Sequence, residues 1–161
     1  MIIKITNYFY FLLVILLSSC NQLDAKKKSI IIPQLNTVSF DVVEKNFQID
    51  KEIPTNVSYL LNTWFNEKVK INGIDGKVTF RITDYNEKIS TNSDSKRIDI
   101  SLKFSALIEK PLLSKKKFIE GEVKSYGEIE GSFSMNDFDD IIQKTQTDVI
   151  LRLSRDLGSK I

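Results

Sequence analysis

The chain has 161 residues, with 23 basic and 21 acidic side chains and a formal net charge of +2. This length suffices for one domain with a hydrophobic core, and the charge is too balanced for a typical nucleic-acid binder. The chain has no histidine and a single cysteine, Cys20, which removes the commonest general base, most zinc ligands and any internal disulfide. The composition therefore favours a protein that is not an enzyme and that holds no cofactor or metal.

The N-terminus has the pattern of a secretion signal. An unbroken apolar run covers residues 8–17, which is too short for a bilayer span of about 20 residues. The small residues Ser18 and Ser19 follow it, directly before Cys20. This pattern predicts cleavage between Ser19 and Cys20, so that residues 1–19 are a signal peptide.

The sequence Leu17-Ser18-Ser19-Cys20 resembles the lipobox of bacterial lipoproteins. The resemblance implies a diacylglycerol on the sulfur of Cys20 and, because Asn21 follows, anchoring in the outer membrane on its periplasmic face. We then expect residues 20–34 to form a lipid-anchored tether and residues 35–161 to form a single domain. The alternative is an ordinary secretory signal with a chance cysteine at its end.

The first elements of the domain are a strand and a helix. Apolar and polar residues alternate over Thr37–Val43, which predicts a half-buried strand. A helix is expected to begin at Pro54 and to end before the turn residues Asn72-Gly73 and Asp75-Gly76. Its apolar residues recur at helical spacing: Val57, Leu60, Leu61, Trp64 and Phe65.

Three more strands are expected, over Lys77–Tyr85, Arg97–Ile108 and Ile119–Phe133. The polar segment Ser90–Ser95 is expected to be a loop between the first two of them. Pro111 and the run Lys115–Lys117 are expected to lie in the connection before the last strand. That strand carries three glycines on its apolar face, which predicts either close approach by a helix or a kink.

A second helix is expected to close the domain. Ser134 is placed to cap the backbone N–H of Asp137. An apolar stripe then runs from Phe138 to Leu157, and Gly158 is expected to follow the last helical residue.

These elements predict an α+β fold in the order β-α-β-β-β-α. We expect a two-layer domain in which a four-stranded mixed sheet carries two helices on one face. The first connection would be a right-handed parallel crossover, and the remaining strands would form an antiparallel meander. The other sheet face would then be open to solvent.

Two charged surfaces are candidate sites. The open sheet face carries carboxylates that could perform acid–base or metal chemistry, although alternating charges are also typical of a solvated antiparallel sheet. Lys115, Lys116 and Lys117 form a candidate interaction surface. They would either bind phosphate groups or discourage pairing with another strand edge.

The lipobox and the expected topology together resemble the LPS-assembly lipoprotein family, as does the closing helix over residues 147–153. The resemblance implies a non-enzymatic module that docks on an outer-membrane barrel or a lipid-transport partner. Two alternatives stay open: a stand-alone lipid- or glycan-binding lipoprotein with a groove between helix and sheet, and an auxiliary lipoprotein of a lipid-transport ABC system.

Overall fold

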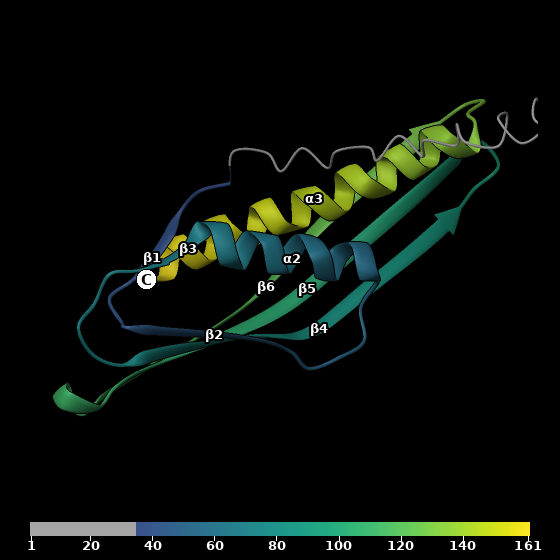
Figure 1. Cartoon of the computed structure of the whole chain (residues 1–161). Helices are drawn as coiled ribbons and strands as arrows, with labels where there is room; N and C mark the ends of the chain where they lie inside the picture. Colours follow the sequence, from purple (N-terminus) through teal and green to yellow (C-terminus); the bar gives the residue numbers. More distant parts are fainter. Residues whose placement is uncertain (1–34) are drawn as a thin grey trace, which may run out of the picture. The chain divides into compact units, whose positions relative to one another are not determined.

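The computed structural model describes residues 35–161. The expected signal peptide, lipidated Cys20 and tether lie outside the described residues and stay predictions. The described part has the expected α+β fold, with two helices, a four-stranded mixed sheet and a small second sheet (Figure 1). In chain order its elements are β1 Val38–Phe40, β2 Glu44–Ile49, α2 Thr55–Lys68, β3 Val69–Ile71, β4 Lys77–Thr91, β5 Ser95–Lys110, the 3₁₀ turn η1 Pro111–Leu113, β6 Lys115–Glu130 and α3 Met135–Lys160.

The larger sheet has the strand order β2-β4-β5-β6. β2 runs parallel to β4, and Phe47 lies opposite Phe80. β4, β5 and β6 form the expected antiparallel meander. β1 pairs in parallel with β3 in the second sheet. Because α2 lies between the partners of both parallel pairs, it provides the crossover connection that parallel strands require.

The first strand departs from the sequence expectation. Thr37–Val43 does not join the four-stranded sheet, because the chain bends after β1 and β2 takes the edge position. The backbone N–H groups of Val43 and Glu44 donate to the carbonyl oxygen of Gly76 at this bend, at 3.1 and 3.3 Å. β2 was missed because its side chains are only half-buried, which weakens the alternation. β3 was missed because its three residues follow α2 directly.

The strands of the meander are longer than expected. β4 continues to Thr91, so the predicted loop Ser90–Ser95 shortens to a turn in which Asn92 N–H donates to Ser95 O at 2.8 Å. β6 already begins at Lys115, opposite Lys110 of β5. The placement of the lysine run in the connection was therefore wrong. The connection consists of η1 and Ser114, whose φ of 51° permits the tight reversal.

Both helices pack on the same face of the larger sheet (Figure 1). Trp64 of α2 meets Phe80 of β4 edge-on, with ring centroids 5.4 Å apart. Phe80 in turn stacks on Phe104 of β5 at 5.8 Å. Along β5 the buried side chains alternate as expected, at Ile98, Ile100, Leu102, Phe104 and Ala106. The other sheet face is left uncovered by the described elements.

A lysine of β2 caps the C-terminus of α2. The amino group of Lys45 donates to the carbonyl oxygens of Phe65, Asn66 and Val69 at 3.0, 3.2 and 2.6 Å. Carbonyl groups at the end of a helix lack intrahelical donors, and Lys45 supplements the single backbone bond there, from Val69 N–H to Phe65 O. Burial, with repulsion from Lys70, lowers the pKa of Lys45 below its usual value.

α3 begins as expected and ends later than expected. Ser134 Oγ accepts from Asp137 N–H at 3.2 Å, and the Asp137 carboxylate accepts from Ser134 N–H at 2.9 Å, which completes a capping box. The predicted end at Gly158 was wrong, because the helix continues to Lys160. Its last turn is held by the Asp156–Lys160 ion pair and by Lys117, which donates to the carbonyl oxygen of Lys160 at 2.8 Å.

Of the three glycines predicted on the last strand, the two that lie in β6 provide the expected close approach to α3. A Cβ added at Gly121 would lie 2.7 Å from the carboxylate of Asp156, and one at Gly127 would lie 2.6 Å from Ile141 Cγ2. Both sites would clash with a larger residue. Gly131 differs, because it has open space around it and a φ of 76°, which suits the turn into α3.

The core predicts a clear difference between buried and open-face substitutions. Phe104→Ala in β5 and Leu153→Ala in α3 should each lower the free energy of unfolding by about 2–5 kcal/mol, because both side chains are fully buried. Glu122→Ala on the open face of β6 should change it by less than about 0.5 kcal/mol. Urea unfolding followed by circular dichroism measures both. Equal losses would mean that the open face is also buried, against a partner.

Candidate functional site

The candidate site residues fall into two groups. Ser19 and Cys20, at the expected cleavage and lipidation site, lie outside the described residues. Lys115, Lys116 and Lys117 are the first residues of β6, and all three are exposed. They stand at the end of the sheet where β4 begins and β5 ends.

An open hollow of about 760 Å³ lies at this end of the sheet. The β1–β2 bend, the start of β4 and the β5–β6 hairpin supply its lining: Val43, Glu44, Gly76, Lys77, Glu109, Lys110, Pro111, Ser114, Lys115 and Lys116. Lys117 is not part of it, since its amino group donates to the carbonyl oxygens of Lys160 and Ile161 at 2.8 and 3.1 Å. The structure therefore divides the lysine run between the hollow and the end of α3.

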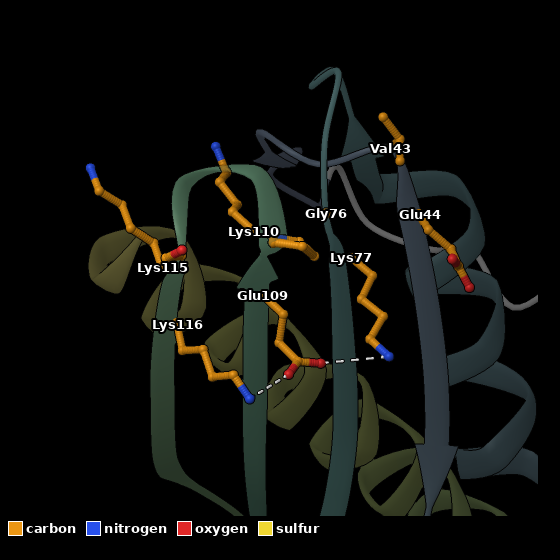
Figure 2. A pocket seen from close by; sticks show the side chains of 10 residues that line it. Val43, Glu44, Gly76, Lys77, Glu109, Lys110, Lys115 and Lys116 are labelled. Carbon is orange, nitrogen blue, oxygen red and sulfur yellow. Dashed lines mark ion pairs between the residues drawn. The ribbon is translucent and has the colours of Figure 1, made fainter.

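Glu109 is the acidic centre of the hollow. In Figure 2 its carboxylate lies between the amino groups of Lys116 and Lys77, at 2.9 and 3.5 Å. These three residues lie opposite one another on β6, β5 and β4, so the strand register creates the row. The hydrogen bond from Lys116, together with the charges of Lys116 and Lys77, outweighs partial desolvation and lowers the pKa of Glu109.

The other two lysines of the hollow extend toward the closed end of the hairpin (Figure 2). Lys110 forms an ion pair with Asp41 of the β1–β2 bend. Lys115 makes no hydrogen bond or ion pair within the part of the chain that the structure describes. The amino group of Lys115 is therefore available to a ligand. The other lysines of the hollow, Lys77, Lys110 and Lys116, are engaged in ion pairs.

Apolar side chains project beside these lysines. Leu112 and Leu113 of η1 are 80% and 57% exposed, Ile74 of the β3–β4 loop is 93% exposed and Val43 is 51% exposed. We call these four residues the apolar tip. The loops that carry them are joined, because Leu112 N–H donates to Asp75 Oδ2 at 3.0 Å and Val43 N–H to Gly76 O at 3.1 Å.

The apolar tip was not found from the sequence, although a signal for it exists. Pro111-Leu112-Leu113 is an apolar triplet between lysines in a short connection, a position where polar residues are typical. Ile74 lies between Gly73 and Asp75 in a turn. Only the folded chain shows that the two segments are neighbours, and that a Cβ at Gly76 would clash with the backbone of Glu109.

Several carboxylates of the open face, among them Asp84, Asp99 and Glu122, are engaged in ion pairs. Asp99 accepts from Arg97 on the same strand at 2.7 Å, and Asp84 pairs with Lys51 at 2.7 Å. Hydrogen bonds from these cations lower the pKa of both carboxyl groups. A general acid at neutral pH needs a raised pKa instead. Over residues 35–161 no group of three or more Asp, Glu, His or Cys side chains could hold a metal ion.

The space between the helices and the sheet is packed. Trp64, Phe80 and Phe104 are fully buried there, and Phe65 stacks on Phe47 with ring centroids 5.0 Å apart. A lipid or glycan groove in this layer would require these rings to move. In the described segment, neither α2 nor α3 has the length and apolar character needed to cross a bilayer.

The sequence matches no protein-family model and no curated protein. The fold is similar to that of a minor lipoprotein from Acinetobacter baumannii, at a TM-score of 0.50 and 9% identity over 74% of this chain and 94% of that one. The rare lipoprotein B from Shewanella oneidensis aligns with a TM-score of 0.48 and 9% identity over 73% of this chain and 96% of that one. A lipoprotein B from Nitrosomonas europaea gives 0.45 and 5% identity, over 77% and 87%. The first likeness shows that this fold occurs in a bacterial lipoprotein.

The ion pairs of Glu109 predict a measurable titration. Lys116→Met should raise the pKa of Glu109, because the strongest stabilisation of its charged form is lost. Lys77→Met should raise it less, since its amino group is farther away. Carboxyl carbon NMR titration measures both.

The same pairs make a pH-dependent contribution to stability. The pKa of Glu109 is lower in the folded than in the unfolded chain, so the contribution is present above the unfolded value and disappears as the pH falls through the folded one. The stability difference between the wild type and Lys116→Met should therefore vanish in acid. A difference that persists below both pKa values would show that Lys116 stabilises the fold by packing rather than by charge.

Proposed function

We propose that this protein is a lipid-anchored periplasmic module that acts by docking on an outer-membrane or lipid-transport partner, without catalysis. The lipobox at Cys20 supports the anchor. The fold supports the same class, because it occurs in a lipoprotein of Acinetobacter baumannii. Residues 20–34 serve as the tether between the lipid and the domain.

The observation that carries the proposal is the concentration of exposed apolar side chains and lysines at one end of the domain. The hollow and the apolar tip both lie there, and both are open to solvent. Exposed apolar groups rimmed by charges are typical of surfaces that bind a macromolecule or a membrane. Several carboxylates elsewhere on the sheet, among them Asp84, Asp99 and Glu122, pair with neighbouring cations, which suits a solvated surface better than acid–base chemistry.

The finer assignment is to lipopolysaccharide assembly at the outer membrane. It is supported by the resemblance of the topology and of the closing helix to the LPS-assembly lipoprotein family. Asn21 after the lipidated cysteine supports the outer membrane as destination. An auxiliary lipoprotein of a lipid-transport ABC system would share the anchor and the docking mode, and would fractionate with the inner membrane.

The proposal predicts partner recovery that depends on the anchor and on one end of the domain. The protein, solubilised from native membranes with its lipid intact, should co-purify with a barrel or transporter subunit. Cys20→Ala removes the only sulfur that can carry the lipid, so it should abolish both fatty-acid incorporation and recovery. Lys77→Glu with Lys116→Glu should reduce recovery at least about tenfold, the effect of about 1.4 kcal/mol.

The control for charge reversal away from the hollow is Lys88→Glu, at an exposed lysine on the far half of β4; each single variant, Lys77→Glu and Lys116→Glu, is compared with it. Lys88→Glu should leave recovery unchanged. Loss of recovery with Lys88→Glu but not at the hollow would contradict the proposed docking end. If Glu120→Gln alone abolished the cellular role of a stably folded protein, the enzyme hypothesis would replace docking.

A further inference from the structure

The end of the domain that carries the hollow combines exposed apolar residues with lysines. Leu112 and Leu113 lie between Lys110 and Lys115 in the tightest part of the β5–β6 hairpin. Figure 1 shows η1 at the closed end of this hairpin, apart from both helices. Amphipathic groups that project in this way suit the boundary between lipid headgroups and acyl chains.

The opposite end of the sheet has a different character. The β4–β5 turn there consists of polar residues, Thr91, Asn92, Ser93 and Asp94, and all four are exposed. Thus only the β5–β6 connection places large apolar side chains in the turn itself; at the opposite end, the exposed Ile89 and Met135 lie in β4 and at the start of α3. This difference provides an internal control for any measurement of orientation.

The first described residues of the domain lie toward the same end. Ser154 Oγ donates to the carbonyl oxygen of Asn36 at 2.9 Å, which fixes the start of the domain on the last third of α3. From Leu35 the chain needs only a few residues to reach Val43 in the apolar tip, a path of at most about 30 Å. The tether over residues 20–34 can extend to about 50 Å. A domain anchored through Cys20 can therefore place this end on the bilayer that holds its lipid.

The lining of the hollow is net positive, because it contains four lysines and two glutamates, Glu44 and Glu109. Glu109 is engaged between Lys77 and Lys116, Asp75 accepts from Leu112 N–H, and Asp41 pairs with Lys110. Lys115 makes no ion pair within residues 35–161 and lies close to the leucines in sequence. An anionic surface is therefore favoured over a neutral one.

We propose that the apolar tip inserts into the interface of an anionic phospholipid bilayer, with Lys115 and Lys116 on the headgroups. This rests on the proposed function, since the lipid on Cys20 brings the domain to the membrane. Insertion would fix the orientation of the domain and hold the hollow at the membrane surface, where an outer-membrane partner would also lie.

The test uses the purified lipidated protein in vesicles. Leu112→Cys introduces a free thiol, because the lipid occupies the sulfur of Cys20, and the thiol is labelled with an environment-sensitive fluorophore. Ser93→Cys in the β4–β5 turn is the matched control. Vesicles of phosphatidylcholine are compared with vesicles of equal parts phosphatidylcholine and phosphatidylglycerol, each with and without a nitroxide quencher on the acyl chain.

The probe at residue 112 should shift to the blue and be quenched in the anionic vesicles, and the probe at residue 93 should stay in water. Lys115→Gln with Lys116→Gln should lower the inserted-to-free ratio by about 25-fold, since each lysine near an anionic surface contributes about fivefold. Replacing Leu113 by Asn should also lower this ratio.

Three results would overturn the inference while the anchor stands. In the first, the protein would float with the vesicles while both probes stay in water. In the second, the probe at residue 93 would be quenched instead of the probe at residue 112. In the third, the probe at residue 112 would be quenched equally in neutral and anionic vesicles. Protein that does not float at all would overturn the lipid-anchored module itself, and the inference with it.

Discussion

The close packing of α3 on β5 and β6 is the contact on which the rest of the domain depends. Gly121 and Gly127 let the 26-residue helix approach β6, and Ser125 Oγ donates to Asp148 Oδ2 at 2.7 Å across the same contact. Close approach buries the valine and leucine side chains on this side of the helix. It also places the described helices on one sheet face and leaves the other face free.

This asymmetry explains where a site can lie. The layer beneath the helices is filled by aromatic rings, so binding features are displaced to the open face and to the ends of the sheet. At one end the strand register places Lys77, Glu109 and Lys116 in a row, and the hairpin carries Leu112 and Leu113 beyond them. The same register that builds the core therefore also builds the hollow.

Alternation and capping chemistry predicted most of the fold, because these signals are local. The bounds of β5 and the start of α3 were predicted within two residues. The alternation of apolar residues in β5 and the capping residue Ser134 before α3 are signals that lie within the segments themselves. β2 and β3 could not be predicted, because their pairing depends on bends and partners distant in sequence. The site shows the same limit: Lys115 and Lys116 were recognised as a charged run, whereas Glu109 joins them only through cross-strand register. The apolar tip likewise requires two loops to meet through Asp75.

We propose that the end of the domain carrying the hollow faces the membrane or a partner in the cell. Lysine footprinting of the unmodified protein tests it directly, by comparing amine reactivity in native membranes with that of the purified protein in detergent. Lys115 and Lys116 should be protected in membranes, while Lys88 on β4 and Lys144 on α3, which are also exposed, should react equally in both. Protection of Lys88 or Lys144 with full reactivity at Lys115 would contradict the claim.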